Sequence, residues 1–149
     1  MTTARRQILL AEDDPNDVLL LRRAFRLAGL PEPEQVVSDG EEAVAYLDGA
    51  GEYADRERHP LPGLLLLDLK LPRRSGFEVL EWVRGDPRVS ALPIVVLTSS
   101  RQPGDVERAY ALRANSYLVK PATQGGLREM VQALDLYWLR MNEGPVLQR

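Results

Sequence analysis

Residues 64–76 read LLLLDLKLPRRSG, in which four consecutive leucines are followed directly by an aspartate. Apolar residues without polar alternation are typical of a strand that is covered on both faces of a parallel sheet. Pro72 and Gly76 then mark a loop, and the amphipathic stretch 77–84 predicts a helix. The segment therefore indicates a strand–loop–helix unit with Asp68 at the carboxyl end of a buried strand.

The same alternation of short apolar strands and amphipathic helices runs along the chain. The helix after the first strand begins with Asp14 as its N-cap and Pro15 in the first helical position, and Asp17 is an acid of its first turn. Five such units in series predict an α/β fold, a doubly wound parallel five-stranded sheet with helices on both faces. The expected strands are 7–11, 35–37, 64–67, 94–97 and 116–119, and the expected helices are about 15–28, 40–48, 77–84, 103–112 and 124–141.

Length and composition narrow the class of protein. The 149 residues, 44% hydrophobic and 28% charged, fit one globular domain. The absence of cysteine excludes disulfide frameworks, thiolate zinc sites and cysteine nucleophiles, and a single histidine, His59, cannot build a multi-histidine metal site. A net charge of -3 gives no reason to expect nucleic acid as a partner. No signal peptide or membrane-spanning stretch is visible, so we expect a cytoplasmic protein without membrane contact.

Polar side chains gather where the expected strands end. Glu12 and Asp13 follow the first strand, Asp68 the third, Thr98 the fourth, and Lys120, one of only two lysines, the fifth. Ligands of open α/β sheets bind beyond the carboxyl ends of the strands, so these side chains are expected at one site. Clustered carboxylates repel each other unless a cation lies among them, and oxygen ligands favour Mg²⁺. The set predicts transfer of a phosphoryl group to a carboxylate, with a lysine and a hydroxyl holding its oxygens.

Four sequence strings resemble those of the response-regulator receiver domains, in the same order and at family spacing. They are ILLAEDD (8–14), LLLLDLKLPRRSG (64–76), IVVLTSS (94–100) and YLVKP (117–121). The resemblance covers about residues 6–141 and implies the flavodoxin-like strand order 2-1-3-4-5. It also implies that the chain, 1–149, is a single receiver domain with a short tail, 142–149, and no output domain.

A narrower resemblance links the chain to stand-alone, phytochrome-associated response regulators. It rests on the strings YLDGAGEYADRERHP (46–60) and VRGDPRVSALPIVVLTSS (83–100), and on the ending Tyr137-Trp138-Leu139. The partner that this resemblance implies is a sensor histidine kinase of the bacteriophytochrome type.

The receiver resemblance also assigns roles to the residues at the strand ends. It makes Asp68 the phosphoacceptor, while Thr98 and Lys120 hold the phosphoryl oxygens. The implied ligands of Mg²⁺ are Asp13 directly, Glu12 mainly through water, Asp68, and the backbone carbonyl of Lys70. A receiver domain catalyses only its own phosphorylation and slow dephosphorylation, so no enzyme acting on foreign substrates is expected.

Two conformational features follow from the same resemblance. Tyr117 matches the aromatic residue whose rotation accompanies a shift of Thr98 on phosphorylation. Lys120-Pro121 matches a cis peptide bond of the family.

The last expected helix carries apolar residues on two sides. Leu136 and Leu139 lie beside Tyr137 on the side away from the core stripe. Together these three predict an isologous homodimer surface through the fourth and fifth helices. The core stripe itself is expected from Leu127, Met130, Val131, Leu134, Trp138 and Met141.

Three other functions fit parts of the pattern. An aspartyl-phosphate phosphatase of the haloacid-dehalogenase type would carry a second carboxylate two residues after its nucleophile, where this chain has Lys70. A flavin-binding module would carry a Ser/Thr/Gly-rich phosphate loop after the first strand, where this chain has the acidic string DDPND (13–17). A phosphorylation-independent interaction or dimerisation module stays open, with Thr98 as a core residue and Tyr117 as a half-buried strand tyrosine.

Overall fold

Five parallel strands form one sheet in the order β2-β1-β3-β4-β5, as predicted. The structure, a computed structural model, describes residues 7–147, so residues 1–6 and 148–149 of the expected domain lie outside the described residues. The strands β2, β3 and β5 have the predicted bounds, and the other two differ by one residue. The strands are β1 (Ile8–Ala11), β2 (Gln35–Val37), β3 (Leu64–Leu67), β4 (Ile94–Thr98) and β5 (Ser116–Val119).

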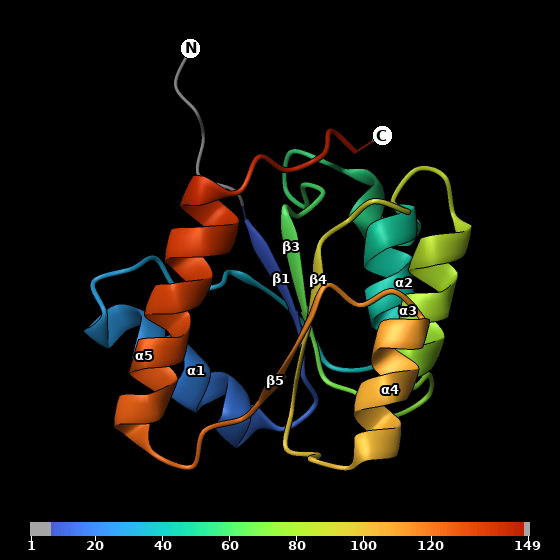
Figure 1. Ribbon diagram of the computed structural model, residues 1–149. Coiled ribbons are helices and arrows are strands. Elements are labelled where there is room, and N and C mark those ends of the chain that lie inside the picture. The colour runs from blue at the N-terminus through green and yellow to red at the C-terminus, as the bar shows by residue number, and fades with distance from the viewer. Residues whose placement is uncertain (1–6, 148–149) are drawn as a thin grey trace.

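Helices cover both faces of this sheet (Figure 1). The helices α1 and α5 lie on one face, and α2, α3 and α4 lie on the other. Within residues 7–147, no helix combines the length and the apolar character that crossing a bilayer requires. The α-helices are α1 (Pro15–Leu27), α2 (Gly40–Asp48), α3 (Gly76–Gly85), α4 (Pro103–Ala111) and α5 (Gln124–Leu134), and a 3₁₀ turn (Gly51–Ala54) follows α2.

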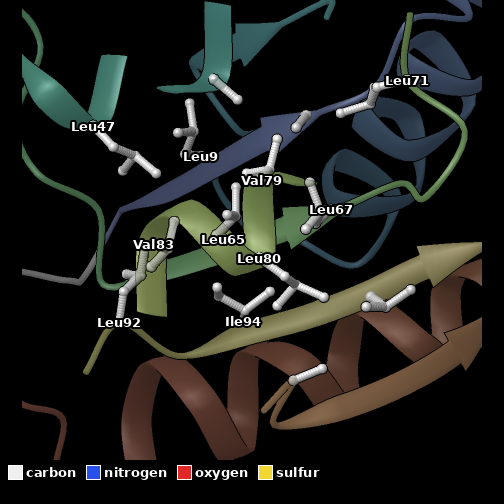
Figure 2. Close-up of a cluster of buried hydrophobic side chains, with 14 of the residues drawn as sticks. Leu9, Leu47, Leu65, Leu67, Leu71, Val79, Leu80, Val83, Leu92 and Ile94 are labelled. Atoms are coloured by element: carbon white, nitrogen blue, oxygen red, sulfur yellow. The ribbon is translucent and has the colours of Figure 1, made fainter. Parts of the chain in front are cut away.

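The four leucines of β3 divide between two cores. Side chains alternate along a strand, so Leu65 and Leu67 pack toward α2 and α3, and Leu64 and Leu66 pack toward α1 and α5. Figure 2 shows the first of these clusters, in which leucines of β3 meet valine and leucine side chains of α3. All four leucines are 0% exposed, and burial of each stabilises the fold by about 1.5–3 kcal/mol. The uninterrupted apolar run thus reflects burial on both faces.

Helix caps place the helix N-termini at the carboxyl edge of the sheet. Asp14 caps α1 as predicted, since its Oδ1 accepts a hydrogen bond of 2.8 Å from the Asn16 N–H. Ser75 and Glu78 form a reciprocal capping box at the start of α3. Strand ends and the positive ends of helix dipoles therefore meet at one edge, which favours negative charge there.

The end of the last helix differs from the prediction. The α-helix stops at Leu134, and Asp135–Met141 is π-helical, with the Asn142 N–H donating to the Tyr137 carbonyl at 2.7 Å. Hydrogen bonds in a π-helix join residues five apart instead of four, which rotates the faces that an α-helical spacing predicts. Leu139, predicted on the dimer surface, is therefore buried with 8% exposure, five residues after Leu134. Met141, predicted in the core stripe, is 66% exposed.

The predicted cis peptide bond is also wrong. Between residues 7 and 147 every peptide bond is trans, including Lys120-Pro121. The trans isomer is the lower-energy form of an X–Pro bond by about 0.5–1 kcal/mol. In the trans chain the Lys120 N–H donates to the Thr98 carbonyl at 2.8 Å, which continues the β4–β5 pairing up to the lysine.

Candidate functional site

Three carboxylates meet at the carboxyl ends of β1 and β3. These strands are neighbours, and the Asp68 N–H donates to the Ala11 carbonyl at 3.1 Å, which sets Asp68 beside the chain that leaves β1. One carboxylate oxygen from each of Glu12, Asp13 and Asp68 lies within 4.8 Å of the others. Glu12 and Asp68 are buried, whereas Asp13 is exposed. The structure therefore brings together the acidic residues that the sequence analysis expected at one site.

Lys120 lies among these carboxylates. It leaves β5 at the same edge, and its Nζ is 2.5 Å from Glu12 Oε1 and 3.1 Å from Asp68 Oδ2. A third contact joins Nζ to Asp17 Oδ2 at 2.7 Å. One ammonium group thus contacts three carboxylates, from the β1–α1 segment and from the end of β3.

Burial and charge shift the pKa values in this cluster. Burial raises the pKa of Glu12 to about 7, with a contribution from Asp68, while the hydrogen bond from Lys120 acts in the opposite direction. Burial would lower the pKa of Lys120, but its hydrogen bonds to Asp17 and Glu12 and the charge of Asp68 hold that pKa above its usual range. The lysine is therefore cationic at neutral pH.

The loop after Asp68 is held close to the acidic site. The Lys70 N–H donates to Asp68 Oδ1 at 3.2 Å, and the Lys70 side chain is exposed. Leu69 and Leu71 on either side of it are buried. At Gly76 a Cβ atom would lie 2.3 Å from the Asp68 carbonyl oxygen, so α3 can start this close to Asp68 only with glycine at this position. The Lys70 backbone is thus beside Asp68, and the ligand role of its carbonyl stays a prediction.

Thr98 begins a second polar network next to the site. It is fully buried at the end of β4, and its Oγ1 accepts a long hydrogen bond of 3.5 Å from the Ser100 N–H. Ser100 Oγ donates to Asp105 Oδ2 at 2.6 Å, which ties the loop to the first turn of α4. The half-buried Tyr117 donates from its hydroxyl to the Ser100 carbonyl at 3.0 Å. Tyr117 of β5 therefore contacts the segment that starts at Thr98.

Three residues of these networks were not predicted: Asp17, Ser100 and Asp105. Asp17 was expected only as a first-turn acid of α1, and its contact to Lys120 spans 103 positions in the sequence. The signal that could have indicated Asp17 is its position, about one helical turn after the Glu12-Asp13 pair. Ser100 and Asp105 are connected by a side-chain contact that no spacing rule predicts.

The sheet order, the acidic pocket at the ends of β1 and β3, and the lysine from β5 define the class of α/β receiver proteins. The chain matches the response regulator receiver domain family over residues 8–132 and belongs to it. Receiver domains are signalling modules of two-component systems that act with sensor histidine kinases, and they bind Mg²⁺ or Mn²⁺ at an acidic pocket. Receiver domains are generally non-enzymatic.

Individual relatives extend over nearly the whole chain. The probable methanogenesis regulatory protein FilR2 of Methanothrix harundinacea is 38% identical over 141 residues, 93% of this chain and 86% of that protein. Response regulator Rcp1 of Synechocystis sp. is 38% identical over 132 residues, 89% of this chain and 88% of that protein.

Solved structures agree with this assignment. The phosphorylated cyanobacterial phytochrome response regulator RcpA is 36% identical, with a TM-score of 0.87 over 96% of this chain and 100% of that one. A Mn²⁺-bound form of response regulator Rcp1 has a TM-score of 0.82 at 36% identity, over 95% of this chain and 99% of that one. The expected likeness to phytochrome-associated regulators is confirmed.

Proposed function

We propose that this chain accepts a phosphoryl group on Asp68 from a sensor histidine kinase, as a single receiver domain of a two-component system. The observation that carries the proposal is Lys120, whose Nζ lies 3.1 Å from Asp68 Oδ2 inside a buried acidic pocket. A lysine in this position neutralises the acceptor and can contact an oxygen of an incoming phosphoryl group. A phosphorylation-independent interaction module has no use for this arrangement.

The acidic pocket fits Mg²⁺. Oxygens from Glu12, Asp13 and Asp68 lie within 4.8 Å of one another, and hard oxygen donors are the ligands that Mg²⁺ prefers. In the proposed site Asp13 and Asp68 bind the ion directly, Glu12 acts mainly through water, and the Lys70 carbonyl is the remaining protein ligand. When bound, the ion neutralises charge on the transferred phosphoryl group.

The transfer step needs no general base on this chain. An ionised oxygen of Asp68 attacks the phosphorus atom, an O–P bond forms, and the P–N bond of the donor phosphohistidine breaks, leaving its electron pair on the imidazole. Lys120 and Thr98 hold two oxygens of the phosphoryl group. His59 lies in the 50–62 loop and packs edge-on against Tyr46 and Tyr53, away from the site, so the donor is another molecule.

A chain of contacts connects Asp68 to the surface formed by α4, β5 and α5. Movement of Thr98 toward the phosphoryl group displaces the segment leading to Ser100, and Tyr117 holds the Ser100 carbonyl at 3.0 Å. Tyr117 therefore moves with Thr98 in the proposed switch. A changed surface of α4, β5 and α5 is its output.

The proposed kinase is of the bacteriophytochrome type, and the support is the likeness to the cyanobacterial phytochrome regulator RcpA.

The proposed homodimer uses the α4–β5–α5 face with Leu136 and Tyr137, which are 49% and 53% exposed, but without Leu139. A groove of about 510 Å³ between β5 and α5 borders Tyr137 and supports this surface. We place the chain in the cytoplasm, where such kinases present their phosphohistidine.

Intact-mass measurement after incubation with acetyl phosphate and Mg²⁺ tests the proposed function. We expect one phosphoryl group on the wild-type protein and none on Asp68→Asn or in the presence of EDTA. Dimer formation is followed by light scattering with and without beryllofluoride. An unlabelled wild-type protein, under conditions that label another receiver domain, would favour the phosphorylation-independent module.

A further inference from the structure

Asp17 contacts the lysine of the site without belonging to the acidic pocket. It lies in the first turn of α1, and its Oδ2 is 2.7 Å from Lys120 Nζ. The group of oxygens close enough to hold a metal ion includes Glu12, Asp13 and Asp68 but not Asp17. The carboxylate of Asp17 therefore acts on the site through the lysine.

The ammonium group of Lys120 has no spare donor. It carries three N–H bonds, and three carboxylates lie within 2.5–3.1 Å of its nitrogen. A phosphoryl group on Asp68 takes over the contact that this carboxylate makes with Lys120, and its additional anionic oxygens draw the ammonium group only if a contact to Glu12 or Asp17 is loosened. The identity of the released carboxylate thus determines how easily the phosphoryl group is held.

Solvent exposure indicates which contact is released. The Glu12 side chain is 5% exposed and would be left buried without its cation, whereas Asp68 is the residue that carries the phosphoryl group. The Asp17 side chain is 36% exposed and can exchange the ammonium group for water. A cavity of about 60 Å³ between α1 and α5, lined by Asp17 and Lys120 among others, gives the lysine room to shift.

We propose that Asp17 is a positioning residue that holds Lys120 in the resting state and competes with the phosphoryl group for the ammonium group of Lys120. Asp17 thereby sets a threshold for phosphoryl acceptance. The inference rests on the proposed role of Asp68. Charge determines the direction of the expected effect: removal of the negative charge of Asp17 beside the site also favours binding of an anionic ligand.

The test compares Asp17→Asn with Asp14→Asn. Both substitutions remove one negative charge near the start of α1, but Asp14 is exposed and its carboxylate accepts from the Asn16 N–H, a capping role that asparagine also fills. We expect Asp17→Asn to bind beryllofluoride, in the presence of Mg²⁺, about fivefold more tightly and to react faster with acetyl phosphate. Asp14→Asn should stay within about twofold of the wild type.

The lysine itself gives a second readout. Only Lys70 and Lys120 carry ammonium side chains, so ¹⁵N labelling of lysine Nζ gives two signals. Lys70 is exposed, and the Lys120 ammonium should exchange its protons more slowly. Asp17→Asn should shift the Lys120 signal and accelerate its exchange, with the urea unfolding midpoint unchanged, and Asp14→Asn should do neither. A merely structural role of Asp17 would move the midpoint and leave the affinity for beryllofluoride unchanged, even though the Lys120 signal shifts.

Equal or weaker beryllofluoride binding by folded Asp17→Asn would overturn the proposal, as would an unaltered Lys120 signal. Failure of the proposed function is distinguishable, because it would appear as absence of labelling and of beryllofluoride binding in the wild-type protein itself. In that case the competition proposed for Asp17 is overturned together with it.

Discussion

The leucines of β3 and the charged cluster one residue beyond them are opposite environments. Leu64 to Leu67 pack within two apolar clusters and have no exposed surface. Asp68 and its neighbours place three carboxylates around one ammonium group, with burial raising the pKa of Glu12. Burial of the apolar region stabilises the folded state. Burial of the charged region costs free energy, because it keeps a reactive carboxylate away from water. Three predictions test this division, from the largest expected effect to the smallest.

Leu66→Ala should lower the free energy of unfolding by about 3 kcal/mol, because it leaves a cavity in a packed core. Urea denaturation measures this loss. Leu19→Ala on α1 is the control: the side chain is 64% exposed, and a change below about 0.5 kcal/mol is expected. A loss as small as that of the control would show that the β3 core does not carry the stability assigned to it.

Lys120→Met should lower the free energy of unfolding by about 2 kcal/mol at pH 8, because three carboxylates then lack their cation. The hydrogen bond from Lys120 lowers the pKa of Glu12, so its loss raises that pKa further above its unfolded value. Folding then favours proton uptake, so the deficit should be full at pH 8 and shrink as the pH falls toward 5.

Urea denaturation at both pH values checks this effect of Lys120. Lys70→Met provides the matched control, since that side chain is exposed and should change stability by less than about 0.5 kcal/mol. A deficit that is independent of pH would contradict the electrostatic explanation.

Mg²⁺ affinity should fall about tenfold between pH 8 and pH 6, because a proton on Glu12, whose pKa is about 7, competes with the ion. Calorimetric titration with Mg²⁺ at several pH values measures this dependence. Glu12→Gln should bind more weakly but with a flatter pH profile. An equally steep profile in Glu12→Gln would assign the proton to another group.

Two kinds of feature could be predicted from the sequence: the apolar pattern within a strand or helix, and the polar residues directly after a strand. The apolar run 64–67 became a strand with the predicted bounds, since burial on both faces leaves an uninterrupted apolar signature. The half-buried strands 35–37 and 116–119 also have the predicted bounds. Glu12, Asp13, Asp68 and Lys120 could be grouped because parallel strands end at a common edge.

The features that could not be predicted from the sequence depend on contacts between elements or on a change of hydrogen bonding within one helix. The contact of Asp17 to Lys120 connects α1 to the end of β5, and no local pattern encodes it. At Leu139 the spacing rule itself fails, because the helix changes from four-residue to five-residue hydrogen bonding after Leu134. The Lys120-Pro121 bond was inferred by likeness, and the structure has the trans isomer.

The central claim is that Asp68 is the carboxylate that receives the phosphoryl group. Borohydride reduction of the protein after treatment with acetyl phosphate and Mg²⁺, followed by peptide mass mapping, tests it directly, because an acyl phosphate is reduced to an alcohol at the modified residue. We predict homoserine at position 68 and no such change in the metal-free sample. Reduction at Glu12, Asp13 or Asp17, or at no carboxylate while another receiver domain is modified, would contradict the claim.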